Sequence, residues 1–323
     1  MRVAIAFSAQ RQTPDTDLRE VVAALSDALQ ELGHIPIPVP LAYDVAAFWH
    51  ALAGSRADVV WNLCEEASGR AGRELHAAAL VELLDRPVTG TSAATLALCL
   101  DKSVCRQVLA GSGVPVPDAV RVAVAGQVPR DVPLPAIVKP ACQDGSVGID
   151  RDSVCADRAA VESAVARLGD QGLLPALVEG YVDGRELNVL LLGPAAGPLA
   201  HVAIGEIDLS AVPAGAPRVL TYAGKWHPDS DEFLRTPSHY PADITPQLAD
   251  RVREIGEHAF AALHLSGYAR LDLRVDAEGR CFVIDVNGNP DISPGAGLQR
   301  ALPTLGLSFA DFVALQLQWA WVR

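Results

Sequence analysis

The sequence predicts an α/β (α+β) fold built from more than one domain, and two changes of pattern along the chain support this. In the first hundred residues, short apolar runs alternate with apolar residues at helical spacing, which is typical of an open sheet with parallel strands. Further along, two apolar segments joined by a tight turn, near residues 269–286, indicate an antiparallel hairpin. A length of 323 residues fits two or three domains.

The first domain, residues 1–100, is predicted from its alternating strands and helices. Thr13-Pro14 predicts the start of a helix with apolar residues at helical spacing from Leu18 to Leu32, and Gly33 ends it. The expected strands are residues 2–7, 35–39 and 58–63. Strands joined by helices in this way form a parallel sheet.

The second domain, residues 101–182, begins with a helix that contains Lys102 and ends at glycines 111 and 113. A glycine-containing loop follows its first strand. The expected elements are a strand at 136–139, a helix at 157–168 and a strand at 176–179.

The third domain, residues 183–323, contains a long stretch rich in proline and glycine, residues 210–241. Long loops of this kind are usually lids or disordered, and we expect a lid here. Ser308 with Asp311 predicts a capped N-terminus for the last helix. The other expected elements are strands at 187–192 and 200–207, a helix at 245–263 and a hairpin of strands 269–275 and 281–286.

Composition argues against several classes of protein. The formal net charge of −13 and the lack of a lysine or arginine run argue against nucleic-acid binding. No stretch reaches the roughly 20 apolar residues of a membrane helix, and the N-terminus does not resemble a secretory signal. The six cysteines form no C-x-x-C pair. We therefore expect a cytoplasmic protein that binds neither membrane nor nucleic acid.

The hairpin near the C-terminus carries the strongest chemical signal. Arg270 and Asp272 lie on its first strand, and Asp285 and Asn287 lie on its second. Carboxylate and amide oxygens suit Mg²⁺, so Asp272, Asp285 and Asn287 are candidate metal ligands. Arg270 would face developing negative charge. The alternative is a surface hairpin whose acids cap turns, but both aspartates lie within apolar strand sequence, where an unpaired carboxylate is costly.

A second candidate is a phosphate-binding loop. Lys139 ends a buried strand and offers a point charge, while the loop after it offers backbone N–H groups. Taken alone, this segment reads more readily as a connector. Its candidate residues are Lys139, Gly145, Ser146, Val147 and Gly148.

A third candidate could recognise adenine and ribose, although an ordinary turn between strands is an equally good interpretation. It comprises Glu179, Tyr181, Val182 and Glu186. Lys102 and Lys225, taken singly, read as solvated surface lysines. The order of all five elements changes that interpretation.

In that order the chain resembles the ATP-grasp superfamily, and within it the D-alanine:D-alanine ligases, over nearly its whole length. The matching segments are Pro87-Val-Thr-Gly90 with Asp101-Lys102, Val138-Lys139-Pro140 with Gly145-Ser-Val-Gly148, Leu177-Val-Glu179 with Gly184-Arg-Glu186, Lys225, Gly267-Tyr-Ala-Arg270-Leu-Asp272 and Asp285-Val-Asn287-Gly-Asn-Pro290.

The resemblance implies an N-terminal open α/β domain and two ATP-binding subdomains, with ATP and Mg²⁺ as cofactors. It implies that Lys102, Lys139, Ser146 and Lys225 contact phosphates, that Glu179, Val182 and Glu186 contact adenosine, and that Ile137 and Ile284 enclose the adenine. Arg270 and Lys225 would be catalytic. The resemblance also implies a homodimer.

The departures from the family pattern fall on the amino-acid side. The family's glutamate after the first strand has no counterpart in Phe7-Ser-Ala-Gln10. Gly145 stands where the family has serine, Trp226 where it has tyrosine, and Asp291 where it has glycine. The family's downstream Ser-Leu pair is replaced within residues 293–298. We therefore expect a changed substrate pocket beside a retained nucleotide site.

Candidate substrate residues come from three segments. Asn62 and Glu65 follow the third strand, where ligands of open α/β sheets gather. Arg73 is a further candidate, although Arg73 and Glu74 read equally well as a helix-start ion pair. The remaining candidates are Trp226, Asn289 and Asp291.

The expected function is that of an ATP-dependent carboxylate–amine ligase working through an acyl phosphate, with small-molecule acid and amine substrates outside peptidoglycan. One alternative is a D-alanine:D-alanine ligase. Another, of a different class, is an ATP-binding regulatory protein without turnover. The identity of the acid and the amine, and whether they belong to one molecule, stay open.

Overall fold

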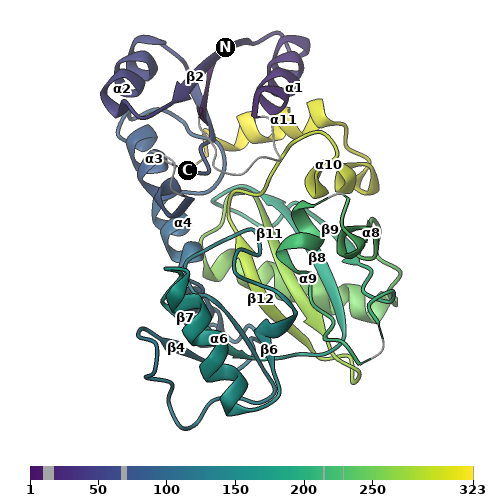
Figure 1. Cartoon of the computed structure of the whole chain (residues 1–323). Helices are drawn as coiled ribbons and strands as arrows, with labels where there is room; N and C mark the ends of the chain where they lie inside the picture. The colour runs from purple at the N-terminus through teal and green to yellow at the C-terminus, as the bar shows by residue number, and fades with distance from the viewer. Residues whose placement is uncertain (10–17, 67–70, 214, 228, 323) are drawn as a thin grey trace.

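The computed structural model describes residues 1–9, 18–66, 71–213, 215–227 and 229–322. Figure 1 shows the N-terminal part at one end of the molecule, the part that contains β4 to β7 at the other, and a large C-terminal sheet between them. Residues 10–17, where the first predicted helix was expected to open, lie outside the described residues.

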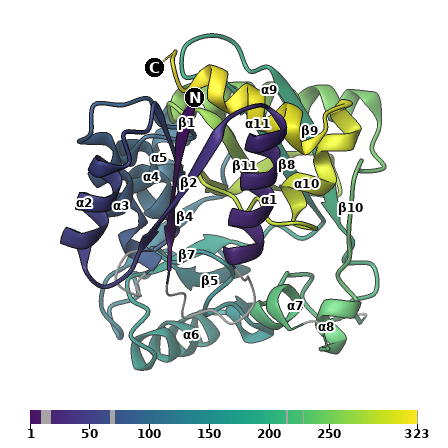
Figure 2. The ribbon, with the colours of Figure 1, turned by 90° about the horizontal axis from the view of Figure 1, so that it is seen from above.

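The N-terminal part is a parallel sheet with helices on both faces, as the sequence predicts. Its strand order is β2-β1-β3, and both pairings are parallel. Val3 and Ile5 of the central strand pack on the side of α1, while Ala4 and Ala6 pack on the side of α2 and α3 (Figure 2). The elements are β1 (Arg2–Ser8), α1 (Leu18–Glu31), β2 (Ile35–Leu41), α2 (Val45–Gly54), β3 (Val59–Leu63), η1 (Ala71–Arg73) and α3 (Glu74–Glu82).

Two helices lead from this sheet to a small antiparallel sheet of strand order β4-β7-β5-β6. Asp101 caps the second helix through its side chain, so Lys102 is the first helical residue. The elements are α4 (Ala93–Leu100), α5 (Lys102–Gly111), β4 (Ala119–Val122), β5 (Ala136–Pro140), η2 (Arg151–Ser153), β6 (Val154–Cys155), α6 (Arg158–Asp170) and β7 (Ala176–Gly180).

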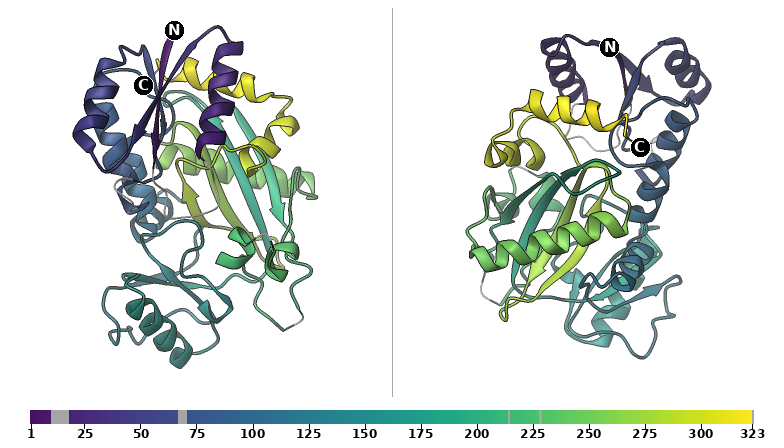
Figure 3. Two further views of the ribbon diagram at one scale, coloured as in Figure 1. Left: turned by 45° about the horizontal axis from the view of Figure 1, so that its top comes forward. Right: turned by 180° about the vertical axis from the view of Figure 1, so that it is seen from behind.

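The C-terminal sheet has five antiparallel strands in the order β10-β9-β8-β11-β12. One face packs against α9, which crosses the back of the sheet in the right panel of Figure 3. The elements are β8 (Arg185–Gly193), β9 (His201–Ile207), α9 (Pro246–Ala262), β11 (Gly267–Val275) and β12 (Cys281–Asn287). The predicted hairpin is confirmed.

The predicted lid, residues 210–241, contains short regular elements that its low periodicity did not indicate. Each helix begins at a side-chain cap, Thr221 for the first and Ser230 for the second. The elements are α7 (Tyr222–Trp226), α8 (Asp231–Leu234) and β10 (Ser238–His239).

The chain ends on the N-terminal sheet. The predicted capping box of Ser308 and Asp311 is confirmed at the start of α11. Phe312 of this helix meets Trp61 of β3, with ring centroids 6.0 Å apart, within one shared core. The last elements are α10 (Gly297–Ala301), η3 (Leu302–Leu305) and α11 (Phe309–Trp319). In the described part of the chain, no helix is long and apolar enough to cross a membrane.

Candidate active site

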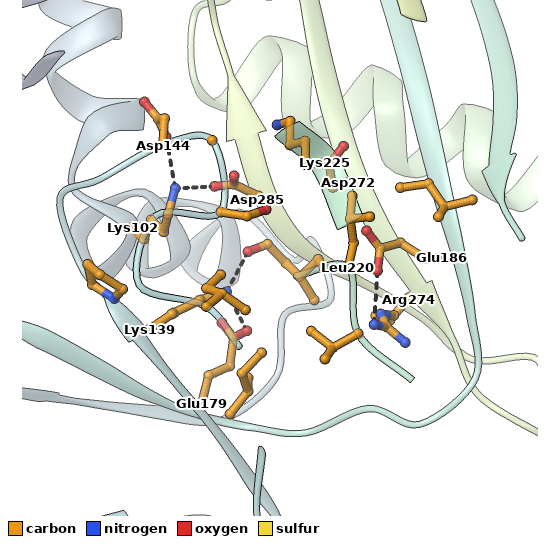
Figure 4. Close-up of a pocket in the computed structure, with 18 of the residues that line it drawn as sticks. Lys102, Lys139, Asp144, Glu179, Glu186, Leu220, Lys225, Asp272, Arg274 and Asp285 are labelled. Carbon is orange, nitrogen blue, oxygen red and sulfur yellow. Dashed lines mark hydrogen bonds and ion pairs between the residues drawn. The ribbon is translucent and has the colours of Figure 1, made fainter. Parts of the chain in front are cut away.

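A cavity of about 960 Å³, measured to its open mouth, lies between the two antiparallel sheets. Its wall is formed by α5, by β5 and the loop after it, by β7, by α7 of the lid, and by the C-terminal sheet (Figure 4). The cavity therefore contains residues from all five predicted motifs.

The C-terminal sheet supplies its side chains to the cavity in parallel rows. Alternate residues of β11 face α9, and those between them face the cavity. Successive rows are roughly 7 Å apart, two residues along each strand. In order along the sheet, the rows are Glu186 and Arg274, then Asn188, Asp272 and Asp285, then Leu190, Arg270 and Asn287.

Lys102 joins three segments that are distant in the sequence. Its Nζ lies 2.6 Å from Asp285 Oδ1 and 3.0 Å from Asp144 Oδ1 (Figure 4). Burial alone would lower the pKa of Lys102, but these two carboxylates raise it. Burial alone would raise the pKa of Asp285, but Lys102 and Lys139 lower it to about 2. Both groups are therefore charged at neutral pH.

Lys139 makes a second bridge across the cavity. Its Nζ lies 2.7 Å from Glu179 Oε1 and donates to the Ile284 carbonyl at 2.9 Å. Because Ile284 belongs to β12, this lysine links the two sheets. Ile137 and Ile284 line the cavity from opposite sheets.

Lys225 has a different environment from the other two lysines. It lies on α7, with Nζ 5.3 Å from the centroid of the Trp226 ring. Within the described residues, no carboxylate lies close enough to form an ion pair with it. Burial and the charge of Arg270 lower its pKa to about 8. This cation faces the cavity and can accept an anionic ligand.

Arg270 and Arg274 hold carboxylates of the sheet. Arg270 binds Asp272 with two hydrogen bonds, of 2.8 and 2.9 Å, and Asn188 donates to the same carboxylate at 2.8 Å. Arg274 lies 2.9 Å from Glu186 at the other end of the cavity.

The loop after β5 contains a tight turn in which the Val147 N–H donates to the Asp144 carbonyl. Gly145 and Ser146 are both left-handed, with φ of 69° and 60°, and neither N–H donates within the described residues. Adjacent N–H groups in such a turn can point together at an anion. Gly148 is the one predicted loop residue outside the cavity wall; a Cβ there would lie 3.0 Å from Leu168, so it serves packing.

The metal candidates fit Mg²⁺ in part. Asp272 and Asp285 are register partners that both line the cavity, and the second oxygen of Asp285 has no hydrogen-bond partner in the described part of the chain. Asn287 lies outside the cavity wall, and its Oδ1 accepts the Asn289 N–H at 2.8 Å. The described residues contain no cluster of three acidic, histidine or cysteine ligands. Two carboxylates suit Mg²⁺ when phosphates complete its coordination.

None of the six substrate candidates lines the cavity. Asn62 is buried and its Oδ1 accepts the Cys64 N–H at 3.1 Å. Asn289 is buried too; it accepts from the Tyr268 hydroxyl at 2.9 Å and donates to the Cys64 carbonyl. Both amides therefore hold the backbone where two domains meet.

The other four candidates also lie outside the cavity wall, but Trp226 has a hydrogen bond to a cavity residue. Asp291 accepts from the N–H of Ser293 at 2.8 Å, Arg73 is exposed, and Glu65 is half-buried after β3. Trp226 is the nearest, since its indole N–H donates to the Gly145 carbonyl at 2.7 Å. Their roles stay predictions.

The cavity also contains residues that the sequence did not single out. Arg274 lies two residues after Asp272 on the same strand, so both side chains point to the same face. This spacing is visible in the sequence and could have identified Arg274. Asn188 lines the cavity because β8 pairs with β11 in a register that places Asn188 opposite Asp272. The sequence alone does not reveal that register. Glu74, which the sequence suggested only as an ion-pair partner of Arg73, lies outside the cavity wall; burial and the negative charge of Asp144 raise its pKa to about 8.

This fold and cavity define an ATP-grasp protein, and comparisons with known proteins identify the family. The family model described as "D-ala D-ala ligase C-terminus" matches residues 118–318. A D-alanine–D-alanine ligase of Anaeromyxobacter dehalogenans is 30% identical over 96% of this chain and 94% of its own length. The chain belongs to the D-alanine–D-alanine ligase family, as the motifs predicted. It is an ATP-dependent enzyme that forms carbon–nitrogen bonds and uses Mg²⁺.

A further relative is similar in sequence, and two solved structures are similar in fold. An uncharacterized protein, y4sG, of Sinorhizobium fredii is 31% identical over 79% of this chain and 72% of its own length. A D-alanine–D-alanine ligase from Bacillus anthracis, solved in complex with ATP, superposes with a TM-score of 0.74 and 16% identity over 100% of this chain and 98% of its own. VanG D-Ala:D-Ser ligase from Enterococcus faecalis superposes with a TM-score of 0.74 and 19% identity, over 99% of this chain and 100% of its own.

Proposed function

We propose that this enzyme joins the carboxylate of one amino acid to the amine of a second, with ATP converted to ADP and phosphate. The order of side chains along one sheet face carries the proposal. Glu186 and Arg274 come first, the aspartate row second, and Arg270 third. A nucleotide laid along this face would have adenosine at Glu186 and its terminal phosphate near Arg270.

The lysines would hold the phosphates from three sides. Lys102 comes from α5, Lys139 from β5 and Lys225 from the lid. Because Lys225 has no ion-pair partner among the described residues, a γ-phosphate would supply its counter-charge. The N–H groups of Gly145 and Ser146 would donate to the same phosphates.

Asp272 and Asp285 would hold Mg²⁺, with Asn287 contributing after a change in its present hydrogen bond. The bound ion would neutralise charge on the phosphates. Asp285 is now paired with Lys102, so loading the site would share this carboxylate between two cations.

The chemistry has two steps. A substrate carboxylate attacks the γ-phosphorus, giving an acyl phosphate and ADP; the second substrate's amine then attacks the acyl carbon, and phosphate leaves. Arg270 would stabilise the oxyanion that forms in the second step. The lid, with Trp226 against Gly145, would keep water from the acyl phosphate.

D-alanine is the substrate that the relatives favour for both roles, since relatives named D-alanine–D-alanine ligase match this chain along 96% of its length. A second candidate is a ligase for another small acid or amine outside peptidoglycan. It is supported by Trp226 and Gly145, which stand where the family resemblance implies tyrosine and serine.

The test is product analysis by mass spectrometry with ATP, Mg²⁺ and single amino acids of both hands. We expect ADP and a dipeptide with D-alanine. A dipeptide from a different amino acid, with none from D-alanine, would select the second candidate. ATP binding without ADP release across the whole panel would instead support a regulatory protein.

Two further features stay predictions. We propose a cytoplasmic location because the reaction consumes ATP. The homodimer implied by the family resemblance is tested by light scattering.

A further inference from the structure

Tyr240 directly follows β10, which is the edge strand of the C-terminal sheet and is labelled in Figure 2. The strand beside it is β9, where Ile204 accepts a hydrogen bond from the Ala242 N–H. Tyr240 falls within the predicted lid, residues 210–241, but it is not among the candidate site residues.

Two glycines make room for the ring. A Cβ on Gly205 would lie 2.5 Å from Tyr240 Cζ, so only glycine allows the ring to lie on this strand. A Cβ on Gly297, the first residue of α10, would lie 3.3 Å from the tyrosine hydroxyl. The ring therefore spans from β9 to the start of α10.

The ring lies on the same sheet face as the cavity. Gly205 pairs with Asn188, and Asn188 pairs with Asp272, so the three residues form one row across the sheet. Side chains of directly paired residues point to the same face. Asn188 and Asp272 line the cavity, and Tyr240 extends their row outward.

The hydroxyl of Tyr240 is a potential hydrogen-bond donor to a ligand. Within the described residues it makes no hydrogen bond, while the guanidinium of Arg300 lies 6.0 Å from the ring centroid. Burial raises the pKa of Tyr240, so the hydroxyl is protonated at neutral pH. Arg270 and Asp272 are among its electrostatic neighbours.

We propose that Tyr240 is a specificity-determining residue. Its ring would form the outer wall of the space beside Arg270 in which the amino-acid substrate binds, and it would limit the substrate side chain to a small group. This inference rests on the proposed function. Arg270 occupies the row after Asp272, where the proposed acyl transfer takes place. A bulky substituent on an amino acid held there would meet the tyrosine ring, whereas a methyl group would not.

The test compares wild type with Tyr240→Ala and Tyr240→Phe, using ADP release with D-alanine, D-valine and D-phenylalanine. We expect Tyr240→Ala to shift the ratio of kcat/KM for D-phenylalanine over D-alanine upward by about tenfold or more, the usual range for changing an apolar pocket wall. Tyr240→Phe keeps the wall and should keep the ratio. Tyr43→Ala, at an exposed tyrosine of the N-terminal part, is the matched control.

Calorimetry tests the role of Tyr240 separately from the proposed ligase function. Each amino acid is titrated into each variant with Mg²⁺ and a non-hydrolysable ATP analogue, so the wall is tested even without turnover. No ADP release by wild type with any amino acid would overturn the proposed function alone. An unchanged preference in Tyr240→Ala, in both turnover and binding, would overturn the role of Tyr240.

Discussion

The three cavity lysines differ in the charge that surrounds them. Lys102 contacts two carboxylates and Lys139 contacts one, while Lys225 has none within ion-pair distance in the described residues. A half-buried cation without a partner is less stable than a paired one, and an anionic ligand can supply the missing counter-charge. We therefore expect the charge of Lys225 to respond more to ATP than the charges of the other two lysines.

The lowered pKa of Lys225 predicts a pH dependence of ATP binding. Its ammonium is charged below a pKa of about 8 and becomes neutral above it. The affinity of the free enzyme for Mg·ATP should therefore fall as the pH rises through about 8, measured by calorimetry from pH 7 to 9.5. Lys225→Met should bind more weakly at every pH and lack this step; a step of the same midpoint in Lys225→Met would show that another group titrates.

At the scale of single residues, sequence reasoning found Asp285 because an unpaired carboxylate within apolar strand sequence is costly. It found Lys139 only through the order of the motifs, since the segment around this lysine reads by itself as a connector. It missed Asn188, whose position depends on pairing between strands that are 84 residues apart in the chain. It also gave Asn289 a substrate role, although this amide is buried and bonded to Tyr268.

At the scale of elements, periodicity predicted the long helices and the core strands because burial enforces it. The short helices α7 and α8 were not predicted, because four or five residues are too few to show helical periodicity. Their caps, Thr221 and Ser230, were the only local signal. The described residues of the predicted lid therefore contain more regular structure than their composition indicated.

The contact between the lid and the phosphate loop predicts the behaviour of Trp226→Phe. This variant keeps an aromatic ring but loses the hydrogen bond from the indole N–H to the Gly145 carbonyl. A less securely closed lid should admit water to the acyl phosphate. We expect more ADP released per dipeptide formed, measured by comparing the two products in one reaction. An unchanged ratio would show that this hydrogen bond does not hold the lid closed.

At the scale of the whole molecule, the domains are joined by close contacts that no sequence pattern reveals. Gly267, at the start of β11, is a left-handed residue with φ of 72°. A Cβ there would lie 2.6 Å from Gln316 Oε1 and 2.7 Å from Gly90 Cα. Segments from the N-terminal part, the C-terminal sheet and the last helix meet at this glycine.

Gly267→Ala should therefore lower the free energy of unfolding by more than about 3 kcal/mol in urea denaturation, because backbone strain and steric conflict add. Gly279→Ala is the matched control. It has a similar φ of 75° in the turn of the hairpin, but its Cβ would have no neighbour closer than 4.0 Å. It should cost only about 1 kcal/mol. Equal losses for the two variants would rule out the contact at Gly267.

The sequence indicated three domains and their order, but not that Phe312 near the C-terminus would pack against Trp61 of the third strand. Both residues look apolar in sequence, and apolar character does not specify a partner. The proposed domain boundaries stay predictions.

The central claim is that the cavity activates a carboxylate by transferring a phosphoryl group to it. The most direct test supplies D-alanine with ¹⁸O in its carboxylate, together with ATP and Mg²⁺, and measures the isotope content of the released phosphate by mass spectrometry; a different amino acid replaces D-alanine if product analysis selects it. The account predicts one ¹⁸O atom per phosphate, and no labelled phosphate from Asp285→Asn. Dipeptide formation with unlabelled phosphate would contradict the account.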